Sequence, residues 1–449
     1  MKTKYIMLSF FLSILTVNSF AQQLSMADAV RLLEKNNGNL NAAKYAVEQR
    51  HFEQQKTKGL RLPNLGLEGN YTHINEDITI DLNPIRDAIA KLHQIPDAGG
   101  TLGSWNNVVQ KQDFGNLNAM AKWPIYAGGK INIAIDASKI QEKSAENKQE
   151  ITRDELYTNL IDLYYKTQLA AKSLALRGTI FESVNIHAAH ANQLFKNGIV
   201  AEVETLNAKV ALSNAQREVL AAKKDYSLAK TALENLIGEY EFDTLTTKFI
   251  TPIALQPLQD YQAVVLAQYP QLKYINNQKE LTKLATKKEK SAYLPEIALF
   301  GKKYVYRNNV SVLEPDWAVG VGLKFNVFDG FQRRNNIKAA QAQTKEVEYL
   351  DVQAKRSVNT FVEQLYNEIE KQREQYESLN SDEALAQKLK FMREKAFENG
   401  MGTSVEVIDA TVQLSAIQLK KYQALYQYNA KYGALVIAQN NFTAFISEL

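Results

Sequence analysis

Phe195-Lys-Asn-Gly198 and Phe397-Glu-Asn-Gly400 are two copies of one short motif, and they lie 202 residues apart in a chain of 449 residues. The same offset pairs Trp123-Pro-Ile-Tyr-Ala-Gly128 with Phe325-Asn-Val-Phe-Asp-Gly330, and it pairs Tyr164 with Tyr366. A constant offset over more than a hundred residues indicates a tandem duplication without net insertion in that stretch.

The first copy is longer than the second upstream of Trp123. Leu62-Pro63 matches Leu294-Pro295, which leaves about 30 extra residues in the first copy. We assign them to an insertion at 78–110. Within it, Ile85, Ile89 and Leu92 fall on one side of a short helix. This segment is either a lid over an outer mouth or a packed surface loop, and we favour the loop.

Both copies predict the same order of elements. A helix (25–59 and 260–291) is followed by two short strands, one very long helix, a tight turn at Gly198 or Gly400, and a shorter return helix. No proline occurs between Pro124 and Pro252 or after Pro315, and proline costs about 3 kcal/mol inside a helix. We expect a first repeat at 22–238, a linking segment at 239–257 and a second repeat at 258–449.

The helices have the spacing of coiled coils. Apolar residues alternate in steps of three and four at Val219, Ala222, Tyr226, Ala229, Leu233 and Leu236. Alanine is frequent on the other faces, and small side chains let a helix approach neighbours on both sides. A closed ring of helices and an ordinary antiparallel coiled coil both fit this pattern.

The strands alternate between apolar and polar residues. In 317–328, Val319, Val321, Leu323, Phe325 and Val327 face one way, and 64–71 and 116–126 alternate similarly. Each is about ten residues long, which is the length of a tilted membrane-spanning strand. A soluble sheet with one wet face alternates in the same way. Trp123 and Trp317 lie near strand ends, where membrane aromatic girdles lie.

The N-terminus has the pattern of a signal peptide. Lys2 and Lys4 precede an apolar run from Tyr5 to Val17, and we place cleavage after Ala21, so that 1–21 is removed. The chain contains no cysteine, so it has neither disulfides nor a lipid anchor at the cleavage site. No later stretch is apolar enough for a transmembrane helix. A membrane would therefore be crossed by strands, and four strands per chain require several chains to share one barrel.

Charge and motifs exclude several functions. The net charge of +4 falls to +2 when the two lysines of the signal peptide are lost, so a nucleic-acid partner is not expected. We find no motif of a phosphate-binding loop, nucleophile elbow or zinc protease, and we expect neither an enzyme nor a cofactor. His187 and His190 have the spacing of two metal ligands, but we favour a solvated helix face and expect no metal site.

With these features the chain resembles the TolC-type outer-membrane efflux family. The resemblance covers the mature chain and is carried by the duplication and by the turn motif. The motif contains an aromatic residue, glycine, an acid before Leu or Ile, and alanine two places later; it occurs at 195–209 and 397–411. The aromatic-x-Gly junctions at Tyr126-Ala-Gly128 and Phe328-Asp-Gly330 also fit the family.

The resemblance implies a mainly α fold with β, in which each repeat is a helix, a β-hairpin and a long helical hairpin. It implies a homotrimer with a 12-stranded β-barrel in the outer membrane of a Gram-negative bacterium, continuing into a periplasmic α-helical barrel. Such a subunit is a passive exit duct of a tripartite efflux or type I secretion system, served by a periplasmic adaptor and an inner-membrane pump. A periplasmic coiled-coil adaptor and a structural coiled-coil protein are the alternatives.

The resemblance also implies an acidic constriction at the periplasmic tip. Asp409 and Glu406 match its positions, and Glu204 matches Glu406 in the first repeat. Thr403-Ser-Val-Glu406 has, however, the spacing of a capping box, a purely structural role for Glu406. Some relatives carry a basic residue at the position of Thr403 that bridges helices, and this chain lacks it.

Overall fold

The computed structural model describes residues 22–399 and 401–447, without the side chains of Glu398 and Ala444. The expected signal peptide at 1–21 lies outside the described residues. The chain forms two compact units. We call the described residues of Met1–Tyr45, Asn147–Tyr274 and Val352–Leu449 the helical unit, and Ala46–Glu146 with Ile275–Asp351 the strand unit. Each is described by itself.

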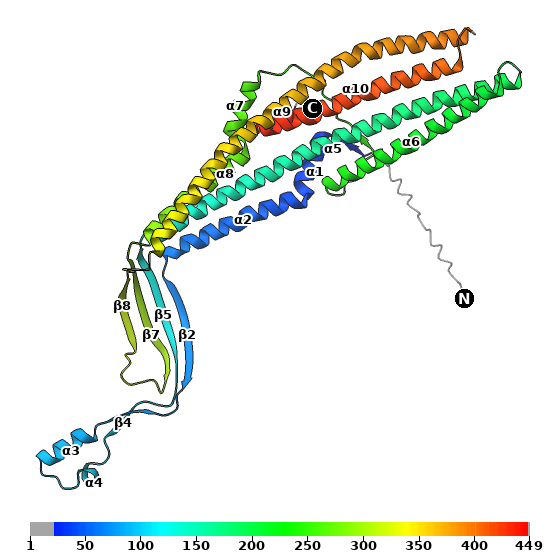
Figure 1. The fold of residues 1–449 in the computed structure, drawn as a ribbon. Coiled ribbons are helices and arrows are strands. Elements are labelled where there is room, and N and C mark those ends of the chain that lie inside the picture. Colours follow the sequence, from blue (N-terminus) through cyan, green and yellow to red (C-terminus); the bar gives the residue numbers. More distant parts are fainter. Residues whose placement is uncertain (1–21, 400, 448–449) are drawn as a thin grey trace, which may run out of the picture. The chain divides into compact units, whose positions relative to one another are not determined.

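The strand unit contains one four-stranded antiparallel sheet (Figure 1). Its order is β2 (Asn64–His73), β5 (Asp113–Ala127), β7 (Glu296–Asn308) and β8 (Trp317–Lys324). Each repeat contributes one sequential pair, and β5 of the first pairs with β7 of the second. β2 and β8 are the edges, so each has one side without a partner strand in the described chain.

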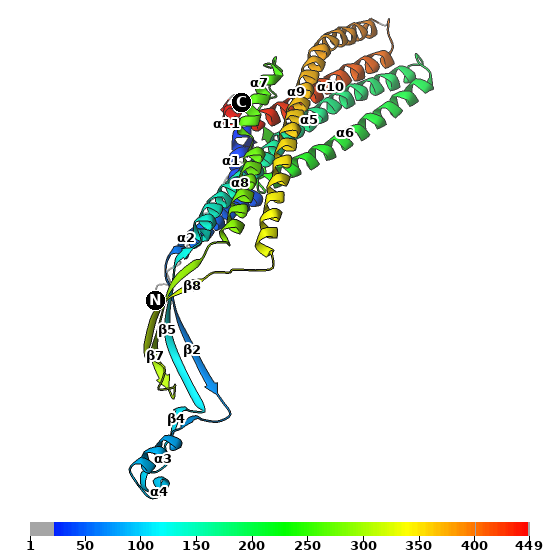
Figure 2. The ribbon, with the colours of Figure 1, turned by 60° about the vertical axis from the view of Figure 1, so that its left-hand side comes forward.

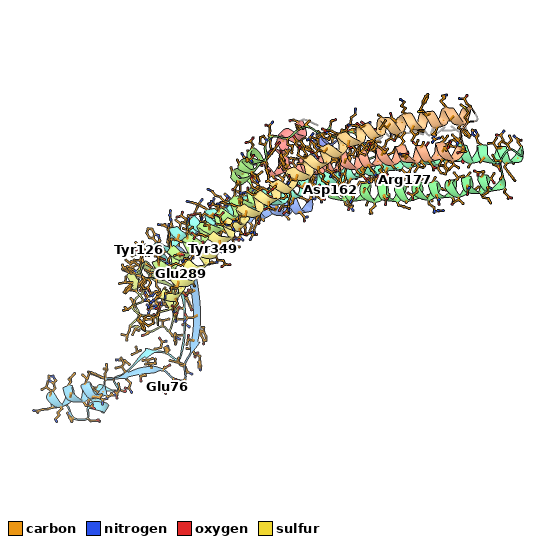
Figure 3. All side chains as sticks on the ribbon, turned by 45° about the horizontal axis from the view of Figure 1, so that its top comes forward. Glu76, Tyr126, Asp162, Arg177, Glu289 and Tyr349 are labelled. Atoms are coloured by element: carbon orange, nitrogen blue, oxygen red, sulfur yellow. The ribbon has the colours of Figure 1, made fainter. Side chains whose placement is uncertain are left out.

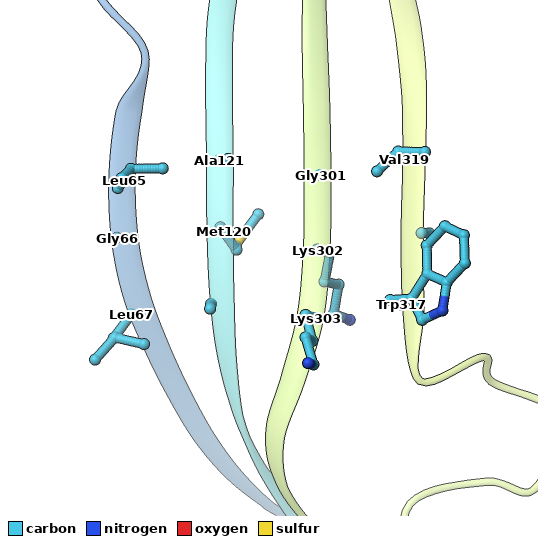
Figure 4. Close-up of a pocket in the computed structure, with 12 residues that line it drawn as sticks. Leu65, Gly66, Leu67, Met120, Ala121, Gly301, Lys302, Lys303, Trp317 and Val319 are labelled. Atoms are coloured by element: carbon cyan, nitrogen blue, oxygen red, sulfur yellow. The ribbon is translucent and has the colours of Figure 1, made fainter.

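One face of this sheet is apolar and exposed. Direct pairing places Leu65 beside Ala121 and Gly301 beside Val319. Figure 4 shows Leu65, Leu67, Val319 and Trp317 along this face. Val319, Val321 and Leu323 are 74%, 66% and 69% exposed, whereas Gly320 and Gly322 lie on the other face. The predicted alternation is confirmed in β8, but the strand ends at Lys324 and not at Phe328. It ends there because Lys324 pairs with Glu296, the first residue of β7, and β8 pairs with no other strand of the described chain.

The insertion is more ordered than the surface loop we expected. It contains β3 (Ile78–Asp81), α3 (Asn83–Leu92), α4 (Ala98–Leu102) and β4 (Asn106–Gln110), with β3 and β4 antiparallel. The side-chain amide of Gln110 donates to the backbone carbonyl of Asn309 at 2.7 Å, and its oxygen accepts from the backbone amide of Ser311 at 2.8 Å. α3 forms as the spacing predicts, but Ile85, Ile89 and Leu92 are exposed.

Two helical hairpins of equal size dominate the rest. α5 (Lys130–Lys196) and α9 (Gln332–Glu398) have 67 residues each, and α6 (Glu202–Leu236) and α10 (Ser404–Ala438) have 35 each. At 1.5 Å per residue each long helix measures about 100 Å. In the helical unit α5 runs beside α6, and α9 beside α10, in both Figure 1 and Figure 2. The long uninterrupted helices are confirmed.

Alanines form the inner seam of α6. Ala208, Ala215, Ala222 and Ala229 are buried at intervals of seven residues. Such a seam brings helix backbones close together. The same need for space occurs at Gly433 on α10, where a Cβ would lie 2.7 Å from Cδ1 of Ile161 on α5.

The core of the helical unit lies where the repeats meet. The largest cluster surrounds Tyr164, Tyr165 and Leu233, all fully buried. Here β1 (Gln23–Leu24) pairs in parallel with β6 (Thr244–Leu245), and the hydroxyl of Tyr164 donates to the carbonyl of Leu24 at 2.8 Å. The α5 carboxylate of Asp162, labelled in Figure 3, accepts from the hydroxyl of Tyr426 on α10 at 2.8 Å.

The first helix of each repeat is broken, contrary to our expectation. The first consists of α1 (Met26–Asn36) and α2 (Gly38–Lys58), and the second of α7 (Leu258–Gln268) and α8 (Pro270–Ser291). Asn37 is extended at ψ 122°, and its side-chain oxygen accepts from the amides of Asn39 and Leu40. Tyr269 is extended at ψ 121°, because a following proline disfavours helical backbone. A short 3₁₀-helix, η1 (Gly59–Arg61), follows α2, and α11 (Phe442–Ser447) is the last helix of the described chain.

Candidate functional site

The site residues predicted from the sequence lie along the chain at the two hairpin turns and in the first turns of the return helices. After α5, Gly198 adopts φ 70° and donates to the carbonyl of Phe195 at 2.9 Å. Ile199 then donates to the carbonyl of Leu194 at 3.0 Å, which closes the helix end. Glycine suits this left-handed position because it has no Cβ. The expectation for Gly400 lies outside the described residues.

The second return helix begins with a capping box. The hydroxyl of Thr403 accepts from the amide of Glu406 at 3.4 Å, and the carboxylate of Glu406 accepts from the amide of Thr403 at 3.2 Å. These bonds satisfy two amides that a helix start otherwise leaves free. The structural role that the sequence allowed for Glu406 is therefore present.

Glu406 also makes an ion pair that the sequence did not reveal. Its carboxylate lies 3.3 Å from a guanidinium nitrogen of Arg393 on α9, with both side chains over 40% exposed. Arg393 thus joins α9 to α10 close to the turn. No spacing rule predicts this pair, because the turn brings together residues 13 apart along the chain.

Asp409 and Glu204 differ from Glu406. Both are exposed, and neither side chain forms a hydrogen bond or ion pair within the part of the chain that the structure describes. Asp409 lies one turn beyond the capping box on α10, and Glu204 lies in the first turn of α6. The N-cap of α6 is Ala201, which makes no side-chain bond. No described contact joins Asp409 to Glu204.

Neither a cluster of metal ligands nor a helix that could cross a membrane occurs among the described residues. In 22–399 and 401–447 no group of three or more His, Asp or Glu side chains is arranged to hold a metal ion. None of the helices described there is both long and apolar enough to cross a membrane. His187 and His190 lie on α5 as expected, but His187 is buried rather than solvated. The favoured interpretation of a solvated face is wrong for that residue.

The family model for outer membrane efflux proteins matches residues 29–239 and 264–440, which is most of the chain and includes both hairpins. The chain belongs to the outer membrane efflux protein family. This is the TolC-type family that the turn motifs predicted.

Solved structures have the same fold as this efflux protein. The outer membrane protein VceC from Vibrio cholerae matches with a TM-score of 0.73 at 13% identity, covering 93% of this chain and 96% of that one. The CmeC channel of Campylobacter jejuni matches with a TM-score of 0.73 at 15% identity, covering 94% of this chain and 88% of that one. The open MtrE channel of Neisseria gonorrhoeae matches with a TM-score of 0.69 at 12% identity, covering 93% of this chain and 89% of that one. None of the curated proteins searched matches this efflux protein significantly.

The family assignment establishes the general function. The efflux protein is an outer-membrane channel subunit of efflux systems in Gram-negative bacteria, and its family is one of ducts and not of enzymes. Membership implies assembly with adaptor and inner-membrane pump proteins. The adaptor and the structural coiled coil, our two alternatives, are therefore not retained. The mainly helical TolC-like fold with strands is confirmed.

Proposed function

We propose that three copies of this efflux protein form the passive exit duct of a tripartite efflux or type I secretion system. Its strands would form one 12-stranded barrel and its hairpins one periplasmic tube. A periplasmic adaptor and an inner-membrane pump would dock at the hairpin turns. The division into repeats at 22–238 and 258–449, with 239–257 as a link, belongs to the same proposal. The equal lengths of α5 and α9, and of α6 and α10, support it.

The open sheet carries the proposal. One side each of β2 and β8 lacks a strand partner in the described chain, and one sheet face exposes Leu65, Val319 and Leu323. In lipid, each free amide or carbonyl on such an edge costs several kcal/mol, whereas the apolar face is favourable. Pairing β2 of one copy with β8 of the next removes both edges. Closure of a barrel needs more strands than one chain supplies.

Exposed apolar side chains on the hairpins support a tube of several chains. Val203, Leu206 and Val210 on α6 are 54%, 52% and 62% exposed, at steps of three and four. Leu385, Leu389 and Met392 form a similar stripe on α9. Coiled-coil stripes of this spacing are buried by neighbouring helices. We assign them to contacts with helices of adjacent copies.

We further propose that Asp409, with Glu204 and Glu406, lines the constriction at the tip. Asp409 is exposed and makes no described bond, so its charge is available to passing ions. Glu406 shares its carboxylate between a helix cap and Arg393. Its contribution to the potential inside a pore is therefore smaller than that of Asp409. The transported substrate is left open.

Disulfide trapping tests the shared barrel. The chain has no native cysteine, so a single cysteine at Leu67 on β2 can be combined with one cysteine at a time along 317–323 of β8. In outer membranes, oxidation is expected to give covalent dimers and trimers for one narrow register of β8 positions. The matched control pairs Leu67 with Lys303 on β7, separated from β2 by β5. A monodisperse monomer in mild detergent, with no trapped pair at any position, would falsify the proposal.

A further inference from the structure

An aromatic cluster joins the two longest helices just before their turns. His187 and His190 of α5 meet Phe397 of α9, with ring centroids 5.6 Å and 6.3 Å from Phe397. The two imidazoles are 6.4 Å apart. Edge-to-face and stacked arrangements at such distances are favourable for ring pairs. Because α5 belongs to the first repeat and α9 to the second, the cluster holds one hairpin against the other.

His187 occupies a site suited to a neutral ring. Only 9% of its surface is exposed, and its Nδ1 has no hydrogen-bond partner among the described residues. A neutral imidazole carries one N–H group, and an imidazolium carries two. Protonation would therefore place a charged ring with an unpaired donor in an apolar contact, which is unfavourable.

The charged neighbours of His187 do not offset this effect. His190 lies on its own helix, and Lys390 and Glu394 lie on α9. Glu394 attracts a proton on His187, but it already accepts from Lys390 at 2.6 Å. Burial, followed by repulsion from His190, lowers the pKa of His187 below 6.5.

The sign of the pH dependence follows from this shift. Well above pH 6.5 the ring is neutral whether the helices are packed or apart, so the contact carries no penalty. As the pH falls through 6.5, the separated or unfolded state takes up the proton first. The packed state is then progressively disfavoured.

We propose that His187, His190 and Phe397 form an acid-sensitive clasp, which holds α5 against α9 at neutral pH and releases the two helices as the pH falls. The clasp goes beyond the proposed duct. It rests on that function only for its consequence, which is a looser periplasmic tip in an acidic medium.

Distances between spin labels test the clasp in the full-length protein. Asn185→Cys and Lys388→Cys place two labels on exposed positions of α5 and α9, in a chain without other cysteines. Labelled chains are diluted with unlabelled ones, so that only distances within a chain are measured. Between about pH 8 and about pH 5 we expect a reversible lengthening or broadening, with a midpoint below 6.5.

Substitutions at His187 distinguish the titration of this residue from general effects of acid on the protein. His187→Phe keeps an aromatic ring that cannot titrate, and His187→Gln keeps a small neutral side chain; at least one is expected to abolish the pH response. His93→Gln, at the end of α3, is the matched control and is expected to leave the response intact. An unchanged distance in the chain with His187 overturns the proposal, as does a persisting response in both His187 variants. The distance is measured without ion flow, so failure of the proposed duct would not affect it.

Discussion

The ring of Phe300 on β7 covers Gly320 on β8, the residue with which it is directly paired. A Cβ added at Gly320 would lie 2.6 Å from Cζ of Phe300, whereas the atoms nearest to one at Gly322, in the Phe300 ring and the Ala298 backbone, would lie 3.9 Å away. Glycine at 320 therefore provides the room for the ring. Aromatic side chains covering glycines in this way fix the register of a sheet.

Because of this contact, substitution of Gly320 should destabilise the sheet more than substitution of Gly322. Gly320→Ala is expected to lower the free energy of unfolding by about 1–2 kcal/mol, because the ring of Phe300 must move. Gly322→Ala is the matched control and is expected to change it by less than about 0.5 kcal/mol. Urea unfolding from detergent or vesicles measures both. Phe300→Leu should remove most of the difference, and equal losses in the two single variants would contradict this packing.

The two faces of β8 should respond differently to charge. Leu323 lies on the exposed apolar face, and Gly322 on the opposite face. If the apolar face contacts lipid, Leu323→Arg should cost about 2–4 kcal/mol near the bilayer midplane. Gly322→Arg should be better tolerated. Assembly into outer-membrane vesicles is the measurement, and equal losses would show that the faces have been misassigned.

The tip acids should differ in their effect on ion flow. Asp409→Asn is expected to weaken cation selectivity and block by divalent ions in planar-bilayer recordings, because neutral amides attract cations less. Glu406→Gln should have a smaller effect, since glutamine also serves in a capping box. Glu204→Gln tests the first repeat. If Asp409→Asn, alone and with Glu406→Gln, leaves selectivity and block unchanged, these acids do not form the constriction.

Asp154 on α5 should make stability depend on pH. It is 8% exposed, and burial, with a smaller contribution from Glu150, raises its pKa from 3.8 to about 6, although Arg153 opposes the shift. The ionised form is thus disfavoured in the fold, so the penalty is absent below pH 3.8 and complete above about pH 6.

Removing this charge should therefore stabilise the protein. Asp154→Asn is expected to raise the free energy of unfolding at neutral pH by about 1–3 kcal/mol, with the gain vanishing near pH 4. Thermal unfolding followed by helical circular dichroism at several pH values measures it. Asp225→Asn, an exposed acid on α6, is the control and should show no such trend. A gain that does not depend on pH would contradict the titration of Asp154.

The sequence predicted the features that depend on local pattern. Missing proline predicted one very long helix in each repeat, as α5 and α9 are, and alternation predicted β2, β5 and β8. The break at Pro270 was also readable, because the residue before proline avoids helical backbone. The break at Asn37 depends on a side-chain cap that many asparagines do not form.

Contacts between the repeats could not be read from one sequence. Periodicity shows that a helix has a buried face, but not which helix covers it. The pairs Asp162–Tyr426 and His187–Phe397 each join residues more than two hundred positions apart. The Arg393–Glu406 pair depends on the geometry of a turn. Candidate acids were therefore found by motif, whereas their partners required the fold.

The unequal caps of the two return helices have a consequence for local opening. Side-chain oxygens accept from the amides of Thr403 and Glu406 at the start of α10, whereas Ala201 offers no such acceptor to α6. Loss of an N-cap weakens a helix start by about 1 kcal/mol. Amides at 202–204 should thus exchange with deuterium several times faster than those at 404–406. In the proposed ring of three chains, hairpin ends that open readily would alternate with ends that open slowly. The two duplicated segments, although equal in length, would then present a docking partner with two different rates of local opening.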